Sequence, residues 1–244
     1  MKLICLIIFI FCNSHFLLAQ KAIEYKWQSS DGKTVAQISI TPAQENVRNK
    51  KNLYLIALQD SINKNFVDIS YNDIVKRLPT SCTIVKIYIE KKLDSQEVHD
   101  FFALSTLVVN EIFPFLQKKN VTSTMEQTII AGVDAGAEIA LISALSISNK
   151  FNKTALFFSN AFAEFASSNQ FDVLAPNIKG KLFIYVKHAE NEMNVLYDMT
   201  EKLTLKSSIM LYKIDAYEED NFSFDDGYNW LIADGNNYVL KTDD

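Results

Sequence analysis

One stretch of the chain has the residue types and spacing of a turn that presents a nucleophile. In residues 128–146 an apolar run leads through a glycine-bracketed turn into a run of small apolar residues. Gly132 and Gly136 stand two positions on either side of Asp134, which is the spacing of the G-x-nucleophile-x-G motif. Only very small neighbours fit so sharp a strand-to-helix turn. The pattern predicts a nucleophile elbow with aspartate in place of serine; the alternative is an ordinary strand–helix turn with small residues for packing.

The first twenty residues have the pattern of a secretory signal. Lys2 precedes an apolar run over residues 3–11, and Ala19 provides a small residue before Gln20. We therefore expect a mature chain that begins near Lys21 and is secreted or periplasmic. Cleavage would leave Cys82 as the remaining cysteine, which excludes an intrachain disulfide.

The composition of residues 21–244 predicts a single domain. No proline-, glycine- or serine-rich linker divides this part of the chain, and 48% of the whole sequence is hydrophobic, enough for a large core. The net charge of −5 argues against binding to nucleic acid. No later run reaches about eighteen consecutive apolar residues, so no transmembrane segment is expected after signal removal.

The order of the expected elements predicts the fold class. A hairpin is expected around the turn at Ser30, Asp31 and Gly32, and Pro114 is expected to perturb the end of a long helix. The expected strands are 22–27, 34–40, 52–58, 83–89, 154–158, 181–186 and 208–214, and the expected helices are 71–78, 95–118, 192–205 and 227–233. A further strand, the elbow and a further helix are expected together within residues 128–146. Alternation from residue 52 onward predicts a doubly wound, mostly parallel α/β sheet with an N-terminal antiparallel hairpin.

Three stretches of sequence carry a family resemblance. Residues 111–116 read Glu-Ile-Phe-Pro-Phe-Leu, the elbow follows, and residues 151–162 run from a Phe-Asn-Lys start to a Ser-Asn-Ala-Phe end. Together they resemble the secreted esterases of the α/β-hydrolase superfamily, in the esterase D and enterochelin esterase-like group. A weaker likeness continues at Glu190 and at residues 227–232. The resemblance implies an α/β-hydrolase fold and a catalytic triad in the chain order serine, acid, histidine.

The chain departs from that triad at two of its three positions. Asp134 replaces the serine, Glu190 aligns with the acid, and Asp220 stands where the histidine is expected. Loss of the hydroxyl and the imidazole removes both the nucleophile and the base that activates it. The prediction is a pseudoenzyme whose pocket, at the carboxyl ends of the strands, binds an unidentified small molecule or protein partner. Three carboxylates there would favour a cation or a basic ligand.

An active enzyme is the alternative hypothesis. Dehalogenase-like and epoxide hydrolase-like relatives on this fold use a carboxylate nucleophile, which forms an ester that a histidine-activated water hydrolyses. Asp134 would be that nucleophile and His188 the base, although a lone histidine in a polar loop is more often a solvated side chain. A third hypothesis is a structural module of an exported assembly, with a large exposed apolar patch and no pocket.

No cofactor and no metal site is expected. The acidic residues between 218 and 226 could bind calcium in principle, but their spacing matches no EF-hand loop. A solvated acidic turn is the favoured interpretation of this segment.

Overall fold

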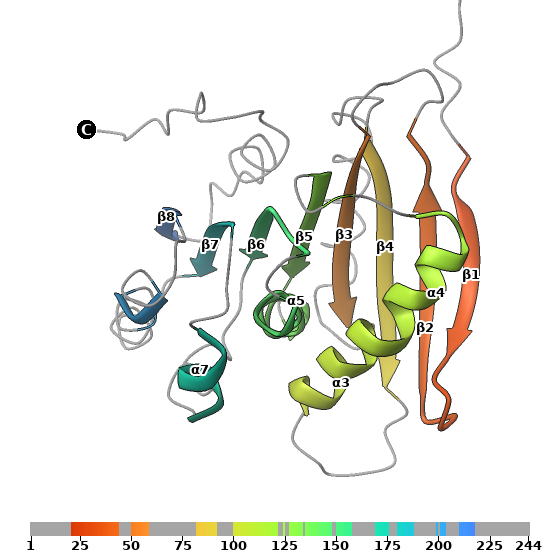
Figure 1. Ribbon diagram of the computed structural model, residues 1–244, viewed down its shortest axis with the longest axis horizontal. Helices are drawn as coiled ribbons and strands as arrows, with labels where there is room; N and C mark the ends of the chain where they lie inside the picture. The colour runs from red at the N-terminus through yellow and green to blue at the C-terminus, as the bar shows by residue number, and fades with distance from the viewer. Residues whose placement is uncertain are drawn as a thin grey trace, which may run out of the picture.

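A single eight-stranded sheet organises the protein, as the computed structural model in Figure 1 shows. The structure describes residues 21–43, 50–58, 82–91, 100–121, 124, 127–133, 135–147, 150–157, 169–175, 180–187, 199, 201–203 and 210–217. The strands are β1 (Ile23–Gln28), β2 (Thr34–Thr41), β3 (Lys51–Leu58), β4 (Cys82–Lys91), β5 (Thr128–Val133), β6 (Lys153–Phe157), β7 (Lys181–Lys187) and β8 (Met210–Tyr217). The signal segment and the helices expected at 71–78 and 227–233 lie outside these residues.

The sheet topology confirms the predicted fold class. The strand order is β1-β2-β4-β3-β5-β6-β7-β8, so β4 is added on one side of β3, and β5 to β8 follow in order on the other. The pairs β1–β2 and β2–β4 are antiparallel, and every other neighbouring pair in the order is parallel. Parallel strands run buried on both faces, which explains the continuous apolar runs from which they were predicted.

Local hydrogen bonds build the N-terminal hairpin. The Ser29 hydroxyl donates to the Asp31 carboxylate over 2.6 Å, and the Lys33 N–H donates to the same oxygen over 3.0 Å. These hydrogen bonds lower the pKa of Asp31, and the one from the Ser29 hydroxyl has the larger effect. Gly32 has a φ of 74°, which glycine adopts without steric cost. The turn predicted from Ser-Asp-Gly is thus confirmed.

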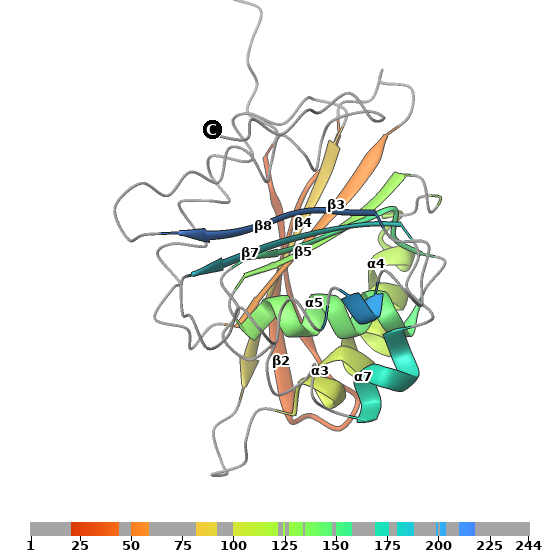
Figure 2. The same ribbon diagram turned by 90° about the vertical axis from the view of Figure 1, so that its left-hand side faces the viewer.

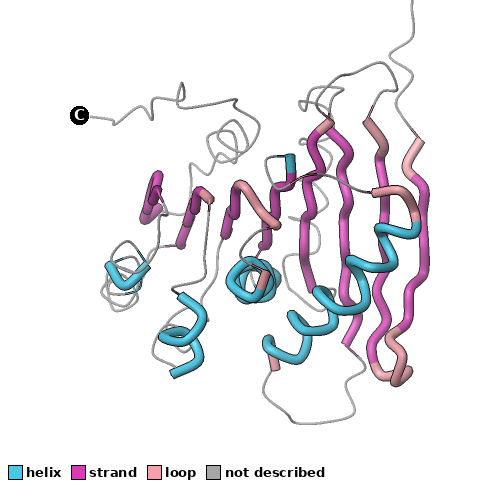
Figure 3. Tube along the Cα trace, viewed as in Figure 1, coloured by secondary structure: helices cyan, strands magenta, loops and turns pink. Residues whose placement is uncertain are grey.

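A continuous helix covers the hairpin side of the sheet (Figure 3). It consists of α3 (Phe101–Leu107), a π-helical segment η1 (Val108–Ile112) and α4 (Phe113–Lys118). Asp100 caps its start by accepting a hydrogen bond from the Ala103 N–H over 2.9 Å. This confirms the predicted helix from residue 101 onward, while residues 95–99 lie outside the described part of the chain.

Pro114 perturbs the middle of this helix rather than its end. A proline lacks the N–H that would bond four residues back, at Asn110, and its ring crowds that carbonyl. The segment before it widens, and the Phe113 N–H bonds five residues back, to the Val108 carbonyl. A single π turn is a common solution to such a break in the helical hydrogen bonds.

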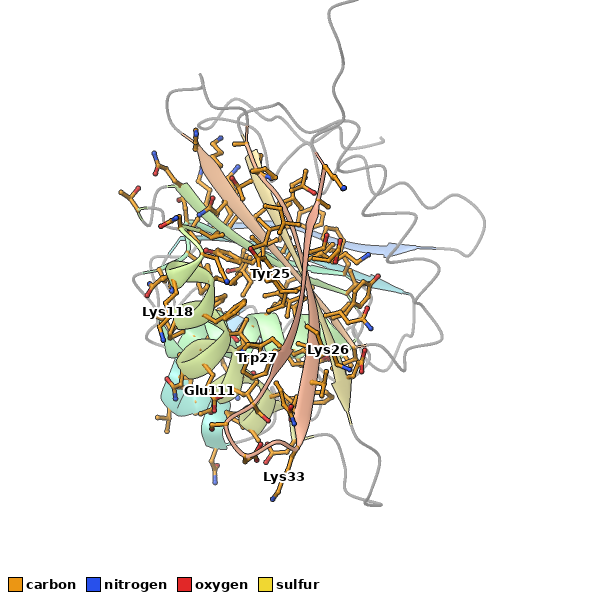
Figure 4. The ribbon with its side chains drawn as sticks, turned by 90° about the vertical axis from the view of Figure 1, so that its right-hand side faces the viewer. Tyr25, Lys26, Trp27, Lys33, Glu111 and Lys118 are labelled. Carbon is orange, nitrogen blue, oxygen red and sulfur yellow. The ribbon has the colours of Figure 1, made fainter. Side chains whose placement is uncertain are left out.

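Glu111, in the π-helical segment, holds the hairpin turn. Its two carboxylate oxygens accept from the Ser30 backbone N–H over 2.9 Å and from the Ser30 hydroxyl over 2.8 Å. Figure 4 shows Glu111 on the helix beside the hairpin, close to the end of the strands. The Glu111 side chain therefore joins two elements that are 81 residues apart in sequence.

Replacement of Glu111 by alanine should loosen this attachment. We expect a loss of about 1 kcal/mol in the free energy of unfolding, because two hydrogen bonds to a partly exposed carboxylate disappear. Urea denaturation measures the change. Lys118→Ala, at an exposed position of the same helix, should stay within about 0.5 kcal/mol of wild type. Equal effects of the two substitutions would show that the contact contributes no stability.

The remaining described helices pack on the same side of the sheet (Figure 2). They are α5 (Ala135–Ser146) and α7 (Asn169–Leu174), and residues 201–203 are also helical, as expected from the sequence. The sequence did not predict α7, because six residues are too few to display a helical repeat. One apolar cluster joins α3, η1, α4 and α5 to the sheet, and it includes Phe113, Ile56 and Leu141.

Candidate active site

One residue separates strand β5 from helix α5, as the predicted elbow requires. β5 ends at Val133 and α5 begins at Ala135, which leaves position 134 alone between strand and helix. All six residues of β5 are buried, and so is every residue from 136 to 145 in α5. Asp134 itself lies outside the described residues. The strand and helix on either side of it nevertheless have the arrangement that the motif predicts.

Two glycines allow the strand and the helix to approach this closely. A Cβ on Gly132 would lie 2.2 Å from the Gly136 carbonyl oxygen, and a Cβ on Gly136 would lie 2.3 Å from the Ile56 carbonyl oxygen in β3. Real Cβ atoms essentially never approach backbone atoms below 3.0 Å. Neither glycine has a positive φ, so close packing rather than backbone conformation requires them.

Substitution of Gly136 by alanine should strongly destabilise the protein. The new methyl group meets backbone atoms of β3, which cannot move aside as a side chain can, so we expect a loss of about 3 kcal/mol or failure to fold. Ser146→Ala, at the exposed end of the same helix, is the control. Thermal and urea unfolding measure both variants. An unchanged stability in Gly136→Ala would contradict the close approach of α5 to β3.

All four predicted site residues lie outside the described part of the chain, so their roles stay predictions. The described strands end just before them. Asp134 follows Val133 of β5, and His188 follows Lys187 of β7, with Glu190 two residues further on. Asp220 comes three residues after Tyr217, the last residue of β8. Because β5, β7 and β8 run parallel, these ends lie at the carboxyl edge of the sheet, where α/β folds bind ligands.

Glu138 is a buried carboxylate that the sequence analysis did not identify. Its side chain lies in the first turn of α5 and is fully buried. Glutamate is almost never fully buried unless it is paired. The sequence does contain a pattern that predicts this burial. Residues 135–146 are apolar on every face of the helix, so the one charged residue among them is expected to be buried as well. Glu138 therefore adds a carboxylate to the elbow helix, four residues after Asp134.

Ser105 fixes the elbow helix against α3. Its hydroxyl donates to the Phe101 carbonyl over 2.6 Å and lies 3.3 Å from the carbonyl oxygen of Ile139 in α5. The hydroxyl has one proton, so it donates to one of these two carbonyls at a time, and the buried serine lies where the two helices meet. The position of α5 is thus set by β3 on one side and by α3 on the other.

Cys82 is not an alternative nucleophile. It begins β4, whose register with β3 puts it at the amino edge of the sheet, opposite the elbow. The side chain is buried, and this burial raises the pKa of the thiol to about 12. The thiolate, which is the reactive form, is therefore scarce at neutral pH.

Alkylation of Cys82 should require unfolding. A pKa of about 12 leaves on the order of one thiol in ten thousand ionised at pH 8, while an unfolded cysteine ionises near its ordinary pKa. We expect iodoacetamide to modify Cys82 at least about 100-fold more slowly in the native protein than in urea. Peptide mass spectrometry measures the rate at this residue. Equal rates would contradict the burial of the thiol.

The described residues contain no group of three or more histidine, cysteine, aspartate or glutamate side chains able to hold a metal ion. Among the same residues, no helix combines the length and the apolar character that crossing a membrane requires.

Comparison with known proteins defines the class to which this architecture belongs. No protein-family profile and no curated protein sequence matches the chain. Solved structures do match, and they include a ferulic acid esterase, an enterobactin esterase and an IroE-like serine hydrolase. The chain therefore shares the α/β-hydrolase fold of these proteins, as the sequence resemblance predicted.

Three of these structures illustrate the likeness. The siderophore hydrolase EstB from Aspergillus nidulans matches with a TM-score of 0.58 and 10% identity, over 86% of this chain and 95% of that protein. An IroE-like serine hydrolase from Shewanella oneidensis gives 0.58 and 12%, over 81% and 74%. The enterobactin esterase FES from Shigella flexneri gives 0.53 and 16%, over 80% of this chain and 54% of the esterase. Identities this low establish the shared fold alone.

Proposed function

We propose that this chain is a secreted, catalytically inactive esterase-fold protein that acts by binding a ligand or a partner at the carboxyl edge of its sheet. The observation that carries the proposal is that a single residue, Asp134, separates β5 from α5. A serine esterase has its nucleophile between the corresponding strand and helix. The scaffold for catalysis is kept while the residue that would perform it is replaced.

The missing base supports the same conclusion. An acyl-enzyme mechanism needs a histidine that accepts the serine proton and later protonates the leaving group. The triad histidine follows the acid in the chain, and no histidine follows Glu190. Asp220 stands at that position, and a carboxylate of ordinary pKa is too weak a base to replace the imidazole in both steps. The loss of both groups is therefore consistent with a binding function rather than slow catalysis.

The charge of the proposed site indicates the class of ligand. Asp134, Glu190 and Asp220 follow the carboxyl ends of three parallel strands, where side chains from different loops converge on one pocket. A site with three carboxylates favours a cation or a basic molecule. Two of the neighbours are named for siderophores or enterobactin, so a siderophore is a further ligand to test.

The alternative function is hydrolysis with Asp134 as the nucleophile. The elbow would expose its carboxylate, and His188, directly after β7, would activate the water that cleaves the ester intermediate. This hypothesis predicts that substitution of either residue abolishes turnover. The pseudoenzyme hypothesis predicts that neither residue matters for a reaction that does not occur.

Hydrolysis of short-chain aryl esters separates the two hypotheses. Wild type should be inactive within the limits of the assay, because neither a hydroxyl nucleophile nor a triad base is present. The double variant Asp134→Ser with Asp220→His should gain measurable turnover, since it restores both groups on an intact scaffold. Asp134→Ala with Asp220→His is the matched control and should stay inactive.

Each result of this assay has a defined meaning. Turnover by wild type that Asp134→Ala abolishes would overturn the proposal and assign a carboxylate nucleophile. Turnover in the restored pair alone would support lost catalysis. Calorimetric titration with a basic ligand, an acidic ligand and a metal-free siderophore then tests binding. Preference for the acidic ligand would contradict the proposed carboxylate pocket.

A further inference from the structure

β1 is an exposed edge of the sheet. It stands at one end of the strand order, and among the described residues no strand pairs with its outer side. Glu24, Lys26 and Gln28 are exposed, and Ile23 keeps 48% of its surface accessible. Figure 4 shows this edge towards the viewer, with Tyr25 and Trp27 on the helix side of the sheet and Lys26 on the other. Such an edge is a template for a further strand.

The hairpin geometry shows which backbone groups face outward. The Ser29 N–H donates to the Thr34 carbonyl, and the Thr34 N–H donates to the Ser29 hydroxyl, so Ser29 and Thr34 form a hydrogen-bonding position of the ladder. Hydrogen-bonded pairs recur at every second residue of an antiparallel ladder. Tyr25, which pairs with Ile38, therefore bonds to β2. The N–H and C=O groups of Glu24 and Lys26 point away from the sheet.

The sequence of β1 is complementary to itself in one register. In a twofold antiparallel pair, residues that face each other must lie on the same side of the sheet. Pairing centred on Tyr25 meets this condition and places Glu24 opposite Lys26 twice. It also places Ile23 opposite Trp27. Pairing centred on Glu24 would instead place this residue opposite Glu24 of the other copy, and pairing centred on Lys26 would do the same for Lys26. Like charges directly opposite each other are destabilising.

We propose that β1 is a homodimerisation edge, at which a second copy of this chain adds its own β1 antiparallel, in the register centred on Tyr25. The outward backbone groups of Glu24 in one copy bond those of Lys26 in the other, and their side chains form ion pairs on the face of the sheet opposite α3, η1 and α4. The outward backbone groups allow this register, and the charge pattern favours it over the registers centred on Glu24 or on Lys26.

Nothing in the sequence of β1 blocks the pairing, and the packing of Tyr25 holds the strand in place. The strand contains no proline, which is a common means of blocking an edge. On the face that carries the helix, the Tyr25 ring packs edge-on against Phe115 with 5.7 Å between the ring centres, and the Lys119 ammonium lies 4.7 Å from the Tyr25 ring centre.

A pair of short strands buries less area than the roughly 1,000 Å² typical of stable interfaces. A reversible dimer with a micromolar dissociation constant is therefore expected.

Sedimentation of the purified protein from about 1 µM to about 100 µM tests the proposal. Glu24→Lys and Lys26→Glu should each weaken the dimer by about tenfold, because each creates two like-charge pairs. The double exchange Glu24→Lys with Lys26→Glu restores both ion pairs with the charges swapped, so it should dimerise within about threefold of wild type. A purely local effect of either charge would not be rescued in this way.

A backbone variant tests the hydrogen bonds separately. Lys26→Pro removes an N–H that points away from β2, so it should abolish dimerisation while the hairpin keeps its ladder. Circular dichroism verifies the fold of each variant, and the charge variants test the proposal even if this one unfolds. A wild type that stays monomeric over the whole range would overturn the proposal. So would a dimer that resists Lys26→Pro, or a double exchange as weak as its parents.

Discussion

The elbow helix reaches the sheet because two residues have no side chain. Gly132 lies against the first turn of α5, and Gly136 lies against the backbone of β3, at distances that no Cβ could occupy. This close approach makes the one-residue turn after β5 possible, and it places α5 where Ser105 and the apolar cluster can hold it. The packing of the described core around β3 and β5 thus depends on a contact between backbones.

This constraint separates the fold from the chemistry. The nearest contacts of the two glycines are with backbone atoms of Gly136, Ala137, Ile56 and Ala57, and none of them comes from position 134. A serine esterase could exchange its nucleophile for aspartate and keep every backbone contact that shapes the site. A protein with this architecture can therefore change from catalysis to binding without a new fold, which is why fold alone does not establish activity.

The sequence predicted the elements well, because their signals are local. The apolar runs at 52–58 and 83–89 gave β3 and β4 to within two residues at each end, and the glycine spacing gave the elbow. The strand order and the contact between Glu111 and Ser30 could not be read in this way, because they join residues far apart in the chain. Glu111 entered as part of a motif, and its structural role became visible only when its partner was known.

The buried Glu138 was missed for a different reason. Glu138 matches no position of a catalytic triad, so no motif marks it. Its burial followed from the apolar residues that surround it on every face of α5, a property of the whole helix rather than of a motif. A charged residue in a helix that is apolar all round deserves the same scrutiny as a catalytic motif.

The span between Ser30 and Glu111 has a consequence for the order of folding. The hairpin closes a very short loop, whereas its attachment to the helix must close a loop of 81 residues, and β2 must also wait for β4. Loop-closure entropy makes such distant contacts slow to form. Until they form, the hairpin has no partner on either side, and a two-stranded ribbon alone is only marginally stable. The edge of the finished sheet is therefore expected to be among its last parts to become ordered.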